Sequence, residues 1–291
     1  MEILIFGSSG FLGSHVVNEL NKSRHNLTLF DKIPPIIFSK KNKIILSDLN
    51  NLKELKRAIK GKDIVYNFAG LSDLSSSKHK ARETVTENIL NLVNILDQCV
   101  KYKVKKIMYA STIYVDSNKG FFYKCSKKAA EDYISEYNKI YNLNFTIFRY
   151  GSLYGPGSNI NNGLYKIIKQ MLQSNLLTFQ GSKDSQREYV HVYDAAKASV
   201  DLLNKKYDNQ KIIISGQELI KINELFSLIS EILTKKKKII FSKKKIIGHY
   251  LKTPYTLEKN IVKKYTLPFH VDFSQGLLEL IKYVKKQEKI N

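Results

Sequence analysis

Residues 1–31 decide the fold, and they read MEILIF (1–6), GSSGFLG (7–13), SHVVNELNKSRHN (14–26) and LTLFD (27–31). The apolar run at 2–6 is long enough for a buried strand. Apolar side chains recur at helical spacing over 15–20, and the apolar run at 27–30 predicts a second strand that ends on Asp31. This order is typical of a dinucleotide-binding unit: a strand, a glycine-rich turn, a helix, and a second strand that ends on an acidic residue.

Each of the three glycines has a physical role in such a unit. Gly7 allows a tight turn, and Gly10 lets the backbone approach a pyrophosphate at the start of the helix. Gly13 permits close packing of helix against strand. Asp31 can accept hydrogen bonds from ribose hydroxyls and would repel a 2′-phosphate, so NAD is favoured over NADP. The alternative is a glycine-rich turn without a ligand, which the complete order of elements disfavours.

Strands and helices continue to alternate as far as residue 150. Further strands are expected at 43–46, 63–68, 106–109 and 145–149, with helices at 52–59, 81–102 and 123–141. This alternation predicts an α/β fold with a doubly wound parallel sheet, the Rossmann fold, over residues 1–150. Residues 151–291 are expected to form mainly a smaller α/β substrate-binding lobe, with the option that some segments return to the Rossmann sheet.

Composition excludes several classes of protein. With 291 residues and 43% hydrophobic content, the chain can bury a full globular core. It has no apolar run of bilayer length and no leader-like start, so a cytoplasmic protein without a membrane partner is expected. Two cysteines and six histidines show no ligand spacing, and no metal site is expected.

The chain is strongly basic, with a formal net charge of +22. Such a charge raises the question of a nucleic-acid partner. The lysines are spread along the whole chain, however, which favours a solvated surface and disfavours nucleic acid. A positive field would also attract an anionic substrate such as a nucleotide diphosphate.

Candidate acid–base chemistry lies in Tyr123-Lys124-Cys125-Ser126-Lys127. On a helix, Tyr123 and Lys127 share one face. A free phenol has a pKa of about 10, and a nearby ammonium favours the phenolate, so a lowered pKa is expected for Tyr123. The pair follows a strand that ends at Thr112, on the sheet edge where ligands bind in doubly wound folds. Cys125 is expected to be a packing thiol.

Taken together, these motifs resemble the extended short-chain dehydrogenase/reductase family, and specifically its NAD-dependent nucleotide-sugar epimerases and dehydratases. The resemblance covers nearly the whole chain. Residues 149–156 look like its Arg-Tyr-x-Asn-x-Tyr-Gly-Pro signature, and residues 187–194 look like its Arg-Asp-x-x-x-Val-x-Asp segment.

The resemblance implies roles for individual residues. It makes Thr112, Tyr123 and Lys127 catalytic, with Lys127 also holding the nicotinamide ribose. The cofactor-binding residues that it implies are Gly7, Gly10, Phe11, Leu12, Gly13, Asp31, Asp48, Leu49, Phe68, Ala69, Gly70, Asn88, Tyr123, Lys127 and Tyr150. The substrate-binding residues that it implies are Thr112, Ser152, Asn162 and Arg187.

The activity implied is epimerisation of a nucleotide-diphosphate sugar, with C4 of the hexose as the expected position, through transient oxidation to a keto-sugar. One alternative is a dehydrogenase or reductase with net hydride transfer. Another is an NAD-bound regulatory or RNA-binding protein that kept the fold. The resemblance also implies a homodimer formed through the helices at 81–102 and 123–141.

Some positions depart from the family pattern. Ile113-Tyr114 stands where the 4,6-dehydratases carry Asp-Glu, so dehydration is disfavoured. Asp116-Ser117 replaces the usual Tyr-Gly, and Ser152 replaces an asparagine. No clear Arg-x-x-Asp element occurs near the C-terminus, where many relatives hold the diphosphate. A surface helix is expected over 250–265.

Overall fold

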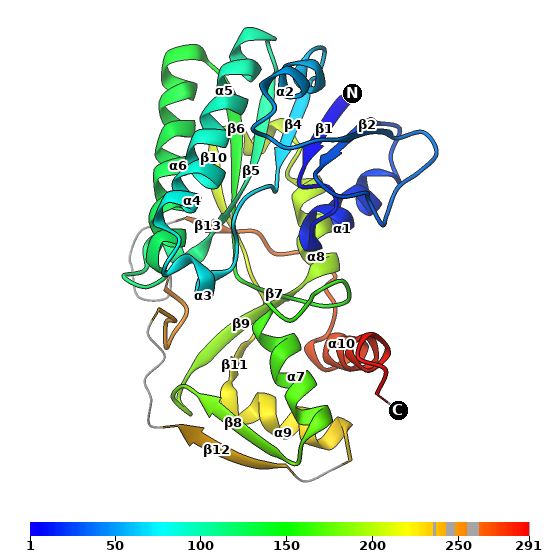
Figure 1. The fold of residues 1–291 in the computed structure, drawn as a ribbon, viewed down its shortest axis with the longest axis vertical. Helices are drawn as coiled ribbons and strands as arrows, with labels where there is room; N and C mark the ends of the chain where they lie inside the picture. Colours follow the sequence, from blue (N-terminus) through cyan, green and yellow to red (C-terminus); the bar gives the residue numbers. More distant parts are fainter. Residues whose placement is uncertain (235–236, 243–247, 255–261, 291) are drawn as a thin grey trace.

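The centre of the molecule is a parallel sheet of eight strands, in the order β13-β10-β6-β5-β4-β1-β2-β3 (Figure 1). The structure is a computed structural model that describes residues 1–234, 237–242, 248–254 and 262–290. The sheet strands are β1 (Glu2–Phe6), β2 (Asn26–Asp31), β3 (Lys43–Leu46), β4 (Ile64–Asn67), β5 (Lys106–Thr112), β6 (Asn144–Tyr150), β10 (Gln210–Ile214) and β13 (Lys263–Lys264). The predicted doubly wound α/β class is confirmed.

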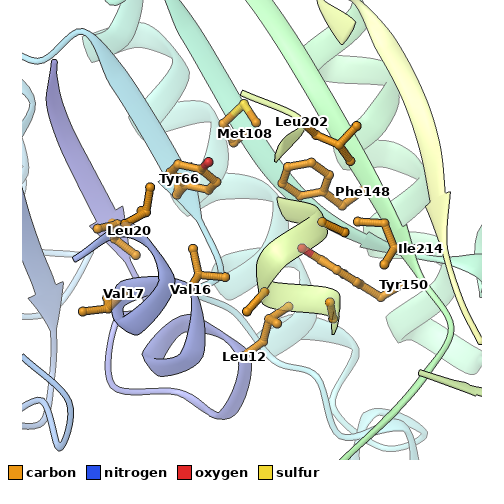
Figure 2. Close-up of a cluster of buried hydrophobic side chains, with 14 of the residues drawn as sticks. Leu12, Val16, Val17, Leu20, Tyr66, Met108, Phe148, Tyr150, Leu202 and Ile214 are labelled. Carbon is orange, nitrogen blue, oxygen red and sulfur yellow. The ribbon is translucent and has the colours of Figure 1, made fainter. Parts of the chain in front are cut away.

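Both faces of the sheet are covered by helices, which explains why the strands are apolar throughout. Alternate residues of β1 enter different cores: Ile3 and Ile5 pack on one face, Leu4 and Phe6 on the other, and all four are fully buried. The first face is covered by α1 (Phe11–Leu20) and α8 (Val192–Asp201), whose packing Figure 2 shows. The second is covered by α2 (Leu52–Ile59), α5 (Asn91–Lys101) and α6 (Phe121–Tyr141).

The helix expected over 81–102 contains a π-helical turn. It consists of α4 (Ala81–Val85), the π turn η1 (Thr86–Leu90) and α5, and a short helix α3 (Leu74–Ser77) precedes it. Such turns often occur at functional sites. Here the π turn carries Asn88, whose side chain is buried.

The smaller lobe has its own core. A three-stranded sheet consists of β7 (Ser152–Tyr154), β9 (Gln186–His191) and β11 (Leu219–Lys221), and a two-stranded sheet consists of β8 (Leu176–Gln180) and β12 (Lys238–Ser242). The helices α7 (Gly163–Gln173), α9 (Ile222–Ile232) and α10 (Phe273–Gln287) pack against them. Between lobe segments the chain returns to the large sheet as α8, the 3₁₀ turn η3 (Lys205–Tyr207), β10 and β13.

Two local expectations are wrong. Residues 250–253 and 262–265 are not helical, and Tyr250 is not at the surface, because it is buried with Ile113 and Ile213 against Tyr114. Residues 255–261 of the expected helix lie outside the described residues. Cys125 is exposed and does not pack in the core, because it lies on the outward face of α6. Among the described residues, no helix is long and apolar enough to cross a membrane.

The packing of α1 on the sheet predicts that truncating a buried leucine destabilises the protein much more than truncating an exposed one. Leu20 is fully buried in α1, whereas Leu46 in β3 is 55% exposed. Leu20→Ala should lower the free energy of unfolding by about 2–5 kcal/mol, because it leaves a cavity. Leu46→Ala should change it by no more than about 0.5 kcal/mol. Urea denaturation measures both, and equal losses would contradict the assigned core.

Candidate active site

The turn between β1 and α1 can be formed only by glycine at two positions. Gly7 has φ +74°, and a Cβ there would lie 2.6 Å from the backbone nitrogen of Ala69. A Cβ on Gly13 would lie 2.0 Å from the carbonyl oxygen of Gly7. The absence of side chains at both positions lets α1 begin directly against the end of β1 and the loop that follows β4.

This turn fits a pyrophosphate. Gly10 is the N-cap of α1 and provides no side-chain cap, so the amides of the first helical turn stay available for an anion. Ser8 is buried, and among the described residues its hydroxyl has no hydrogen-bond partner. A buried hydroxyl of this kind needs a partner, and a phosphate oxygen would supply one.

Asp31 lies at the carboxyl end of β2, beside this turn. Its carboxylate accepts hydrogen bonds from the backbone nitrogens of Ser9 (2.8 Å) and Lys32 (2.7 Å), which hold it at the sheet edge where ribose hydroxyls are expected. Lys32 also contacts Asp48 at 2.7 Å and lowers the pKa of that carboxyl. Sequence reasoning missed Lys32 because this pairing joins two separate loops.

Asn88 connects the loop after β4 to helix α6. Its amide oxygen accepts from the Leu71 nitrogen (2.8 Å), and its amide nitrogen donates to the Leu71 oxygen (3.1 Å) and to Ser126 Oγ (2.9 Å). A Cβ on Gly70 would lie 2.4 Å from the Asn88 oxygen. Loop 68–71, which includes Phe68 and Ala69, is therefore held in place by the buried amide of the π turn.

The three expected catalytic side chains come together from β5 and α6. Thr112, the last residue of β5, lies beside the phenol of Tyr123 near the start of α6 and acts to lower the pKa of that phenol. One turn later, Lys127 is buried and donates to the Ala110 oxygen at 2.8 Å and to the Tyr109 hydroxyl at 3.2 Å. The ammonium also lies 4.7 Å from the centre of the Tyr109 ring.

Burial dominates the protonation of this pair. It raises the pKa of Tyr123 to about 12, against a smaller lowering by the Thr112 hydrogen bond. It lowers the pKa of Lys127 to about 8, against the raising effect of the Glu131 charge. We expected Lys127 to lower the pKa of the Tyr123 phenol. For the protein without a bound ligand this expectation is wrong, because desolvation disfavours the charged form of each group.

An ion network behind these residues joins β5, β6 and α6. Arg149 of β6 contacts Glu131 of α6 at 2.7 Å and Asp116 at 2.8 Å. Glu131 also accepts a hydrogen bond from Ser111 at 2.6 Å. Glu131 lies one helical turn beyond Lys127, and this spacing was the only feature of the sequence that could have indicated its place near the site. Asp116 could not be assigned because its contact depends on the η2 turn (Ile113–Asp116).

Two expected ligand-binding residues have other contacts in the structure. The phenol of Tyr150 points into the core beneath α8 and bonds Ser199 Oγ at 2.6 Å, so its side chain is not free for the cofactor. Asn162 caps α7: its amide oxygen accepts from the Leu164 nitrogen at 3.0 Å, and its amide nitrogen donates to the Leu153 oxygen at 2.8 Å. The signature matches could not reveal these side-chain directions.

The substrate side of the cleft is lined by a cation and aromatic rings. Arg187 of β9 lies 4.2 Å from the centre of the Tyr250 ring, and Ser152 Oγ lies 3.4 Å from the Tyr250 hydroxyl. The Tyr114 hydroxyl is 3.1 Å from Nδ1 of His249. Sequence reasoning found Arg187 and Ser152 but not the rings that contact them. In the described part of the chain, no cluster of His, Cys, Asp or Glu could hold a metal ion.

Several proteins that resemble this chain are named as nucleotide-sugar enzymes. The model of the NAD dependent epimerase/dehydratase family matches residues 3–215. A Methanocaldococcus jannaschii protein, provisionally named UDP-glucose 4-epimerase, is 30% identical over 78% of this chain and 81% of its own length. The Bacillus cereus UDP-glucuronic acid 4-epimerase, solved with UDP-glucuronic acid and NAD, is 25% identical with a TM-score of 0.86, covering 99% of this chain and 100% of the other.

A Thermotoga maritima UDP-glucose 4-epimerase, solved with UDP-glucose, shares the fold with a TM-score of 0.85 at 24% identity, over 99% of this chain and 100% of the other. The family match extends from the first strand of the large sheet to the end of β10. It therefore spans the glycine turn, the Thr112–Tyr123 pair and Arg187 together. This chain belongs to the NAD dependent epimerase/dehydratase family.

Proposed function

We propose that the chain is an NAD-dependent nucleotide-sugar epimerase that acts at C4 of the hexose. The observation that carries this proposal is the juxtaposition of Thr112 and Tyr123, with Lys127 one turn away, at the sheet edge beside the dinucleotide turn. The names of the relatives, UDP-glucose and UDP-glucuronate 4-epimerases, support the reaction and a nucleotide-diphosphate sugar as substrate.

In this reaction Tyr123 takes the proton of the sugar hydroxyl and later returns it. Thr112, which lies beside that phenol, donates to the same sugar oxygen and orients it. A positive charge on Lys127, together with that of a bound oxidised nicotinamide, would favour the phenolate that accepts the proton. A bound NAD would supply the hydride-transfer chemistry that epimerisation through a keto-sugar requires. Its pyrophosphate and ribose would be held by the amides of α1, Ser8 and Asp31.

The residues after Thr112 support epimerisation over dehydration. Ile113 is buried, and Tyr114 bonds His249, so neither position offers a carboxylate for water elimination. The alternative of a dehydrogenase or reductase uses the same three side chains and differs in its net production or use of NADH. The alternative of an RNA-binding relative depends on the charge of +22 and predicts RNA binding with a steep salt dependence.

The epimerase proposal predicts a specific product spectrum. With UDP-, GDP- and dTDP-hexoses and added NAD, proton NMR should show a new anomeric signal without net NADH. Tyr123→Phe should reduce turnover by at least about a hundredfold, because the proton acceptor is lost, while NAD still binds.

Tyr133→Phe on the same helix is the matched control, because Tyr133 is 46% exposed, and it should keep wild-type turnover. Stoichiometric NADH would instead identify a dehydrogenase. Substantial turnover by Tyr123→Phe would exclude the proposed role of that tyrosine.

The buried Lys127 predicts a pH-dependent difference in stability. Its pKa is about 8 in the folded chain, against a usual value of 10.5. Between these values the unfolded chain binds more protons, so this group makes folding more favourable as pH rises. The unfolding free energy of wild type should therefore increase relative to Lys127→Met from pH 8 to pH 10. Lys128→Met, at an exposed neighbouring position, should show no such trend in urea denaturation.

We infer that the chain forms a homodimer through α4, η1 and α6. Exposed apolar side chains lie on these adjacent helices, including Val85 (53%), Leu90 (51%) and Ile140 (64%). A second copy would remove this surface from water. Light scattering at micromolar concentration should show a dimer, and the double variant Val85→Glu, Leu90→Glu should be monomeric. Leu46→Glu should remain dimeric, and a wild-type monomer would contradict the inference.

A further inference from the structure

Arg187 is a half-buried cation that forms no ion pair with any residue that the structure describes. Its neighbour Glu188 points to the other side of β9, where it bonds Ser215 and Lys264, each at 2.7 Å. Arg187 itself donates from Nη1 to the Gln186 oxygen at 2.8 Å. Among the residues that the structure describes, no carboxylate forms an ion pair with Arg187, so most of its donors remain available.

The main contact of the Arg187 side chain is the ring of Tyr250. The guanidinium lies 4.2 Å from the ring centre, which is a cation–π arrangement. Tyr250 is itself fixed: it is only 6% exposed, its hydroxyl lies 3.4 Å from Ser152 Oγ, and its ring centre lies 4.8 Å from that of Tyr114. A fixed ring limits the orientations open to a long and flexible side chain.

The segment that carries Tyr250 is anchored on both sides of the cleft. On the lobe side, the Gln186 nitrogen donates to the Leu251 oxygen at 2.8 Å. On the sheet side, Gly248 packs so closely on the Phe121 ring that a Cβ would lie 2.1 Å from it. Residues 248–251 therefore bridge the strand of Arg187 and the start of α6, which carries Tyr123.

The charge of Arg187 acts on two aromatic side chains near Tyr250. It opposes the burial-induced rise in the pKa of Tyr114, a tyrosine that Tyr123 also influences. Burial and, to a smaller extent, the charge of Arg187 lower the pKa of His249 to about 4. A guanidinium beside neutral rings, with no ion pair to a carboxylate among the described residues, is suited to bind an anionic part of the substrate.

We propose that Tyr250 is a positioning residue that holds the Arg187 guanidinium in place for the diphosphate of the nucleotide sugar. This rests on the proposed function for the identity of the anion. The ring contacts one face of the guanidinium, and the planar donors stay free for two parallel hydrogen bonds to phosphate oxygens. Ordering the arginine before binding reduces the entropy that is lost when the diphosphate binds.

Binding of UDP to the NAD-loaded full-length protein tests this, measured by titration calorimetry. Tyr250→Leu should weaken UDP binding about tenfold, because the cation–π contact is lost. Tyr250→Phe keeps the ring and should stay within about twofold of wild type, since only the long contact to Ser152 is removed. KM for the active nucleotide sugar should rise in Tyr250→Leu while kcat and NAD affinity stay near wild type, whereas a merely structural role would also lower kcat and NAD affinity.

A double variant tests whether the effect of Tyr250 on UDP binding acts through Arg187. In an Arg187→Met background, Tyr250→Leu should cause no further loss of UDP affinity, because its effect acts through the arginine. Unchanged UDP affinity in Tyr250→Leu, or additive losses in the double variant, would overturn the positioning role alone. Wild type that binds NAD but none of UDP, GDP and dTDP would overturn both the proposed function and this inference. Tenfold tighter UDP binding by wild type than by Tyr250→Leu, without epimerisation of any sugar, would support the inference and overturn the proposed function.

Discussion

The close approach of α1 to the end of β1 is the constraint on which the rest of the structure depends. The backbone at Gly13 lies so near the Gly7 carbonyl that a methyl group would be 2.0 Å from it. This approach directs the helix start at the sheet edge and lets the apolar face of α1 cover the core beside α8 (Figure 2). A longer distance would open that core and move the helix amides away from Asp31.

A second constraint is the ion network that joins the strands to α6. Thr112 and Tyr123 come from different elements, and their proximity requires β5 and the start of α6 to keep a fixed distance. Arg149, between Glu131 and Asp116, connects these elements through buried charge-assisted hydrogen bonds. Breaking such a buried network leaves an uncompensated charge, so its geometry is strongly determined.

The cleft is completed by chain segments that are distant in sequence. The lobe contributes Arg187 from β9, and residues 248–251 cross back to contact α6 and Tyr114. Arg187 lies on β9 in the lobe, and Tyr123 lies on α6, which covers one face of the large sheet; these two elements are labelled in Figure 1. In the proposed function, the part around the large sheet supplies the chemistry and the lobe supplies the positive charge.

The sequence by itself determined the elements whose signal is local. The apolar runs, the spacing of the glycines and the alternation with helices indicated the Rossmann order, and the i, i+4 spacing placed Tyr123 and Lys127 on one face. Only the tertiary structure decided the burial that sets their pKa values, the inward direction of the Tyr150 phenol, the capping role of Asn162 and the contact of Tyr250 with Arg187. Each of these depends on residues that are far apart in the chain and meet only when the core is packed, so no local pattern encodes them.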